Sequence, residues 1–260
     1  MRERSVKRRI EMNIAGFKNS IEMLFGEHLH KYGDDEYGFT NISKEEFCKI
    51  GYTTNLTLET IEEARVNQVD MIITHHAPWS FLFGMEESCV EKLKEYEINH
   101  FWIHLPLDFV NFGTCTSLFN EIEIDKILEY SSYEEEELPG IGEYESPILL
   151  YDLVERVEER LEEKVKAWKN HNRPVKRVAI LTGAGNNTNI IKRALEKGCD
   201  TYITGEKTLY TVQYAKFKGI NLIVGSHTFT EVFGVESLAY KLKELNRALE
   251  ITRLYEEHLE

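Results

Sequence analysis

Short apolar runs alternate with amphipathic segments along most of the chain. The apolar runs predict strands at 47–54, 69–74, 99–104, 176–183, 199–204 and 220–225. Helical periodicity predicts helices at 56–68, 85–97, 118–124, 149–168, 187–198 and 206–219, an N-terminal helix ending near Phe25, and a long helix from about Glu231 to the chain end. Strands that alternate with helices in this way are typical of the α/β class with mainly parallel pairing.

The order of strands and helices occurs twice, and part of the sequence repeats at a shift of 130 residues. Ile50 matches Ile180, and Asp70 matches Asp200. A few identities can arise by chance between two units that need the same apolar pattern. Agreement in element order as well favours an internal duplication.

We therefore predict two similar α/β lobes. The first lobe, with the N-terminal helix, is expected at 1–130, and the second at 148–260. The segment 131–147 is acidic, contains two prolines and has no period, so it is predicted to be a linker or an exposed excursion.

Composition narrows the possible partners. The net charge of −14 argues against nucleic acid as an obligatory partner, and an anionic substrate would need a bound cation to approach. No apolar run reaches the length of a membrane helix, and the basic start of the chain lacks the apolar stretch of a signal peptide. The four cysteines are widely separated, which predicts a reducing, cytoplasmic setting and gives little reason to expect zinc–thiolate sites.

Several residues of types that bind metal ions lie together at the ends of the predicted strands. His75 and His76 follow one strand, His104 ends the next, and Glu206 and His227 follow two strands of the second half. Ligands of open α/β sheets bind beyond the carboxyl ends of the strands. This placement predicts a site at that edge.

Each candidate also has a structural explanation. Side chains of neighbouring residues on an extended segment point apart, so His75 and His76 would serve two ions or require a bend; otherwise one caps the following helix and the other faces solvent. Asp108, four residues after His104, is either a ligand or a cap.

Glu231 lies four residues after His227, which brings both side chains to one face of a helix. The competing explanation is a capping box over 228–231, in which the Glu231 carboxylate bonds to backbone. The candidates taken together are three imidazoles and two carboxylates, from His75, His76, His227, Asp108 and Glu231. Five ligands are too many for one open tetrahedral site and suit two adjacent cations that activate a water.

The motifs, in this order, resemble the Nif-three-like dinuclear metal-centre family, whose members are often labelled GTP cyclohydrolase I type two homologues. The resemblance covers roughly 47–249. It rests on "DMIITHHAP", "HLPLD", "PGIGEYESP", "DTYITGE" and "GSHTFTEVFGVESLA".

The resemblance implies the following site. The ligands of two divalent metal ions (Zn, Mn, Fe, Co or Ni) would be His75, His76, Asp108, His227 and Glu231. His104 would be an acid, a base or a neighbour of a ligand, and Glu206 an acidic residue near the cleft. Two α/β lobes would share the metal site and assemble into a toroidal homohexamer.

The sequence departs from the family pattern at three places. Ala77 separates the histidine pair from Pro78, Leu105 replaces a usual threonine, and Lys207 to Tyr210 stand where many members carry histidines. These changes leave the proposed ligands in place and affect the residues that would contact substrate.

Two functions remain open at this point. The first is an enzyme in which a metal-activated water attacks the substrate and His104 or Glu206 transfers protons. The resemblance implies that its reaction is the opening of a purine nucleotide ring, with GTP as the candidate substrate. The second is a metal-binding or metal-handling protein without turnover, acting through its oligomer.

Overall fold

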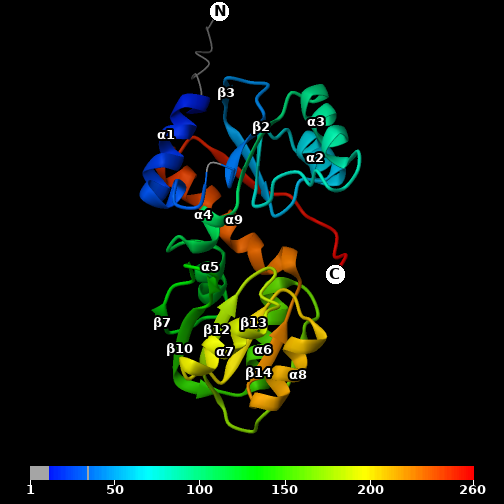
Figure 1. The fold of residues 1–260 in the computed structure, drawn as a ribbon. Coiled ribbons are helices and arrows are strands. Elements are labelled where there is room, and N and C mark those ends of the chain that lie inside the picture. The colour runs from blue at the N-terminus through cyan, green and yellow to red at the C-terminus, as the bar shows by residue number, and fades with distance from the viewer. Residues whose placement is uncertain (1–11, 34) are drawn as a thin grey trace, which may run out of the picture. The chain divides into compact units, whose positions relative to one another are not determined.

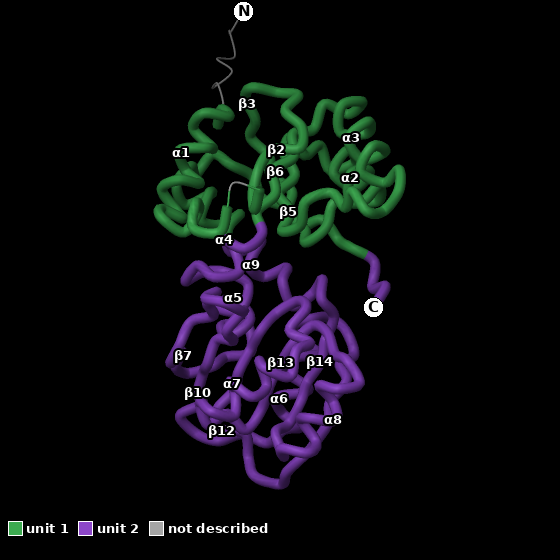
Figure 2. The backbone as a smooth tube through the Cα atoms, in the orientation of Figure 1, with its two compact units in different colours: residues 1–103, 238–256 green, residues 104–237, 257–260 purple. Residues whose placement is uncertain are grey.

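The computed structural model describes residues 12–33 and 35–260 (Figure 1). The chain forms two compact units, coloured separately in Figure 2. Unit 1 comprises residues 1–103 and 238–256, and unit 2 comprises residues 104–237 and 257–260. The predicted start of the N-terminal helix, residues 1–11, lies outside the described part.

Unit 1 is built on a five-stranded sheet in the order β15-β4-β5-β6-β2. Its elements are β1 (Met12–Asn13), α1 (Ile14–Phe25), the 3-10 helix η1 (Gly26–Leu29), β2 (Tyr37–Asn41), β3 (Glu46–Phe47), β4 (Lys49–Thr53), α2 (Leu58–Val66), β5 (Met71–Thr74), α3 (Met85–Glu95), β6 (Asn99–Ile103) and β15 (Glu250–Arg253). The strands β15, β4, β5 and β6 are parallel, and β2 pairs antiparallel with β6.

Helices cover both faces of this sheet. On one face, Ile72 of β5 packs in a buried cluster with Ile61 of α2 and Leu93 of α3. On the other face, the Phe17 ring of α1 meets the Phe101 ring of β6 edge to face, at 5.0 Å between centroids. The strands are apolar on both sides for this reason, which is typical of buried parallel sheets.

Unit 2 contains a six-stranded sheet in the order β11-β14-β13-β12-β10-β7. Its elements are α4 (Leu105–Phe109), α5 (Thr114–Glu121), β7 (Lys126–Glu129), β8 (Ser132–Tyr133), β9 (Glu137–Leu138), β10 (Gly140–Ile148), α6 (Leu150–Leu161), β11 (Lys166–Trp168), β12 (Val175–Leu181), α7 (Thr188–Glu196), β13 (Thr201–Thr204), α8 (Leu209–Lys218) and β14 (Asn221–Val224). The strands β12, β13 and β14 are parallel, while β10 and β11 pair antiparallel with their neighbours. The last helix, α9 (His227–Leu245), begins in unit 2 and continues into unit 1.

The predicted α/β class is confirmed. The two units also share a hydrogen-bond arrangement around Asp70 and Asp200, although the first strands of the two units correspond in register at a shift of 128 residues rather than 130. Asp70 accepts hydrogen bonds from the N–H groups of Cys48 and Lys49, and Asp200 accepts them from the N–H groups of Lys176 and Arg177. Each aspartate thus ties the start of one parallel strand to the start of the next. The origin of the units by duplication stays a prediction.

The unit boundaries differ from the predicted lobes. The division falls at Ile103/His104 and again within α9, whereas the sequence suggested 130 and 147. The second half of the predicted linker belongs to the unit 2 sheet, because β10 lies between β12 and β7, while β8 and β9 in its first half pair with each other. Its buried residues, which include Ile141 and Tyr144, alternate with glycines and acidic residues, so the segment lacks the apolar run of the other strands.

Two predicted helices end earlier than expected. Glu162 adopts a left-handed conformation (φ 57°) that ends α6, and β11 then pairs antiparallel with β14. The terminal helix ends at Leu245, and β15 follows it and pairs with β4. Within the residues that the structure describes, none of the helices combines the length and apolarity needed to cross a membrane.

Candidate metal centre

In unit 1 the histidine pair lies at a bend after β5. The N–H groups of His75 and His76 both donate to the Thr54 carbonyl oxygen, each at 3.1 Å. The ring centroids therefore lie 4.7 Å apart instead of pointing to opposite faces. The following helix, α3, begins after Gly84 without a side-chain cap, so neither imidazole caps it.

The hydrogen bonds of both rings leave Nε2 with the lone pair. His75 Nδ1 lies 3.0 Å from the Ile103 carbonyl oxygen, which only accepts, so Nδ1 carries the proton. His76 Nδ1 lies 2.7 Å from Asn55 Oδ1 and carries the proton for the same reason. A neutral imidazole with Nε2 unprotonated is the form that binds a metal ion.

In unit 2 the start of α9 places His227 and Glu231 one turn apart. Ser226 Oγ accepts from the Phe229 N–H at 3.2 Å, so Ser226 caps the helix and Thr228 lies inside it. The capping box with Thr228 as the cap is therefore not formed. His227 Nε2 lies 3.3 Å from Glu231 Oε2, and Glu231 is 4% exposed.

Asp108 joins the same group from α4. Its Oδ1 accepts a hydrogen bond from Thr114 Oγ1 at 2.9 Å, which fixes the carboxylate at the junction of α4 and α5. One oxygen each of Asp108 and Glu231 lie within 4.8 Å of each other, a separation that one bound cation can bridge. His104, the first residue of unit 2, directly follows the Ile103 carbonyl that accepts from His75.

Two carboxylates surround the His227 ring. Glu206 Oε1 lies 2.7 Å from Nδ1, opposite the contact between Glu231 and Nε2. Burial alone would lower the pKa of His227, but the charges and hydrogen bonds of Glu231 and Glu206 outweigh it and raise that pKa to about 10. The negative charges that favour a proton on His227 also favour a divalent cation beside it.

Glu137 of β9 is a further acidic residue in this part of unit 2. Burial raises its pKa, and the charges of Asp108 and Glu231 raise it further, against opposing contributions from His104 and His227. A carboxyl group that holds its proton more readily suits proton transfer near a reacting group. Sequence reasoning could not select this residue, because it is the last of four consecutive glutamates.

His100 supports the histidine pair from β6. Thr74 Oγ1 donates to the His76 carbonyl oxygen at 2.6 Å and therefore accepts from His100 Nε2 at 2.9 Å. Complete burial lowers the pKa of His100 from 6.5 to about 3, so the ring is neutral in the folded protein.

The stability of the fold should depend on pH through His100. Between pH 6.5 and about 3 the unfolded chain binds a proton that the folded protein excludes, so this group makes stability fall as the pH drops through that window. We expect a slope of about 1.4 kcal/mol per pH unit, which His100→Gln removes. Urea unfolding of both proteins at a series of pH values measures the difference; identical slopes would mean that His100 is protonated in the folded state.

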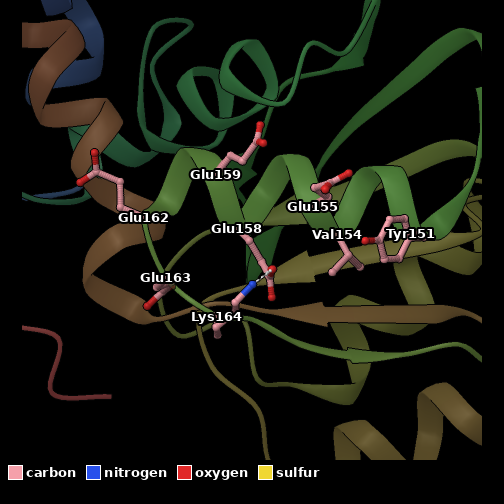
Figure 3. Close-up of a pocket in the computed structure, with 8 residues that line it drawn as sticks. All are labelled: Tyr151, Val154, Glu155, Glu158, Glu159, Glu162, Glu163 and Lys164. Atoms are coloured by element: carbon pink, nitrogen blue, oxygen red, sulfur yellow. Dashed lines mark hydrogen bonds and ion pairs between the residues drawn. The ribbon is translucent and has the colours of Figure 1, made fainter.

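A surface groove along α6 is lined by acidic residues (Figure 3). Its lining comprises Tyr151, Val154, Glu155, Glu158, Glu159, Glu162, Glu163 and Lys164. Its charge does not suit an anionic substrate. Glu163 also bonds the N–H and hydroxyl of Ser226, at 2.7 and 3.0 Å, and so helps fix the start of α9.

Fold and side chains together define an α/β protein with clustered imidazoles and carboxylates of the kind that hold divalent metal ions. The sequence model of Duf34/NIF3 (NGG1p interacting factor 3) matches residues 12–258. The chain belongs to this family.

Several relatives carry the name GTP cyclohydrolase 1 type 2 homolog. The protein from Pyrococcus horikoshii is 31% identical over 207 residues, which covers 77% of this chain and 82% of the relative. The protein from Salmonella typhimurium is 30% identical over 243 residues, covering 89% and 95%.

Solved structures share the fold. Protein ybgI, described as of unknown function, has a TM-score of 0.80 at 25% identity and covers 95% of this chain and 99% of its own. Reduced HcgD from Methanocaldococcus jannaschii has a TM-score of 0.76 at 22% identity, covering 94% and 98%.

Proposed function

We propose that the protein binds two divalent metal ions through His75 and His76 of unit 1 and Asp108, His227 and Glu231 of unit 2. The observation that carries this proposal is the buried Glu231 carboxylate against His227, with Glu206 on the opposite ring nitrogen. That the two sets form one centre is proposed on the family resemblance. Mixed imidazole and carboxylate ligands suit Zn, Mn, Fe, Co or Ni.

The reaction we favour is hydrolytic opening of a purine nucleotide ring, with GTP as the candidate suggested by the names of the relatives. Bound metal ions would lower the pKa of a water and supply a nucleophile near neutral pH. His75 and His76 are held with Nε2 ready to bind, and Glu206 orients the His227 ring, as carboxylates beside metal-binding histidines do. Proton transfer is assigned to His104, with Glu206 as the second candidate.

Metal binding without turnover is the second candidate function. The net charge of −14 repels an anionic nucleotide and does not oppose the binding of cations. In either case a cytoplasmic location and independence of nucleic acid remain predictions from composition.

Metal analysis after reconstitution, combined with formate release from GTP, tests the proposal. His75→Ala and Asp108→Ala, one from each unit, should each lower the metal content because each removes a ligand while the fold survives. Wild-type metal content in both variants would remove these residues from the ligand set. Formate release by the metal-loaded wild type favours the enzyme, and full metal content without turnover of nucleotides or phosphoesters favours the second function.

A homohexamer is proposed on the family resemblance alone. Light scattering at micromolar concentration should give a particle several times the chain mass of 30.4 kDa. A monomer of 30.4 kDa would contradict this assembly.

A further inference from the structure

The segment after β15 carries a carboxylate into the loop beside His76. Glu256 Oε1 accepts hydrogen bonds from Thr53 Oγ1, the Thr54 N–H and the Asn55 N–H, at 2.5, 2.7 and 3.0 Å. Its Oε2 accepts from Asn55 Nδ2 at 2.7 Å. All of these groups belong to unit 1, and Asn55 is 6% exposed.

These contacts determine which way the Asn55 amide faces. A carboxylate oxygen only accepts hydrogen bonds, so the NH₂ group of Asn55 must point to Glu256. The amide oxygen then points to His76, whose Nδ1 lies 2.7 Å away. That oxygen also only accepts, so the imidazole proton is fixed on Nδ1 and the lone pair on Nε2.

We infer that Glu256 is a positioning residue for the metal centre: through Asn55, it holds His76 in the tautomer that binds metal at Nε2. The inference rests on the proposed function for its purpose, but the tautomer itself is a property of the metal-free protein. Glu256 lies about 180 residues after the histidine along the chain and carries no metal-binding motif of its own.

Glu256→Gln tests the inference by replacing one carboxylate oxygen with a donor. The Gln oxygen still serves the three donors at Thr53, Thr54 and Asn55, while its NH₂ group faces the NH₂ group of Asn55. The Asn55 amide then turns over and presents its NH₂ to His76 Nδ1, which moves the ring proton to Nε2. Long-range ¹H–¹⁵N NMR of the metal-free protein, with His76→Gln to assign the ring, reads the tautomer directly.

We expect Nδ1–H in the wild type and Nε2–H in Glu256→Gln, with a loss of Mn²⁺ or Zn²⁺ affinity of about 10- to 100-fold, the usual cost of removing an outer partner of a metal ligand. Glu257→Gln makes the same change of charge at the next, exposed residue and should alter neither result. Nδ1–H in Glu256→Gln, at wild-type metal affinity, would overturn the inference.

The exchange Asn55→Asp with Glu256→Gln provides a rescue. The aspartate introduced at position 55 accepts from the amide introduced at position 256 with one oxygen and from His76 Nδ1–H with the other. The original tautomer and metal affinity should therefore return at unchanged net charge. Because this double variant keeps the hydrogen-bond pattern, it also carries the test if Glu256→Gln alone fails to fold.

Two outcomes separate this inference from the proposed function. Nε2–H in the folded double variant would contradict the inference. A wild type that binds no metal but shows the predicted tautomers would contradict the proposed function. It would still support the inference that Glu256 sets the His76 tautomer through Asn55.

Discussion

Glu231→Gln is expected to remove at least one metal ion per chain and any hydrolytic activity that depends on it. The neutral amide lacks the charge and the second coordinating oxygen that two cations require. Since a ligand that binds only the folded state stabilises it by about 2.7 kcal/mol at 100 times its Kd, the variant should lose thermal stability when metal is present. After chelation the wild type has also lost its metal, so the difference in stability that metal causes between wild type and variant should disappear.

Glu244→Gln is the matched control, because it makes the same substitution at an exposed position of the same helix. It should keep the metal content and the metal-dependent stability of the wild type. Two results together would reduce Glu231 to a structural residue of α9. They are full metal content in the variant before chelation and a change in stability that is the same with and without chelator.

Gly183→Ala is expected to abolish metal binding by displacing two ligands at once. Gly183 follows β12 with φ +61°, and a Cβ there would lie 2.0 Å from Glu231 Oε1 and 3.0 Å from His227 Nε2. The Glu231 side chain has little room to move aside, because the residue is 4% exposed. Backbone strain at a positive φ adds a cost of about 1–3 kcal/mol to the clash.

Gly219→Ala separates strain from displacement. Gly219 ends α8 with φ +70°, and the nearest neighbour of a Cβ there, among the described residues, would be the Asn170 carbonyl oxygen at 3.8 Å. This variant should lose stability through the same backbone strain and keep its metal content. Metal content and denaturant unfolding, measured on both variants, distinguish displacement of the ligands from backbone strain. Full metal content in Gly183→Ala would show that metal binding does not require the Glu231 carboxylate at its observed position.

The parallel strands other than β15 were predictable because each is a short, largely buried apolar run. Ile72 and Ile203, for example, lie in runs that carry no competing signal. β10 could not be recognised in the same way, since its glycines and Pro147 are typical of a loop and only its antiparallel pairing with β12 and β7 makes it a strand.

The candidate site was predictable as far as residue type and strand ends reveal it. His227 and Glu231 do share one face of a helix, and the histidine pair does follow a strand. The partners that orient these side chains were not predictable. Asn55 contacts His76 because β4 pairs with β5, and Glu256 contacts Asn55 because β15 pairs with β4. Both pairings join residues far apart in the chain.

A single metal centre that draws ligands from both units is the central proposal for this protein. Anomalous diffraction from crystals of the reconstituted protein, recorded at the absorption edge of the metal supplied, tests it most directly. We expect two adjacent peaks, with His75, His76, Asp108, His227 and Glu231 as the protein ligands. Peaks bound by residues of one unit alone, or no peak within reach of His227 and Glu231, would contradict it.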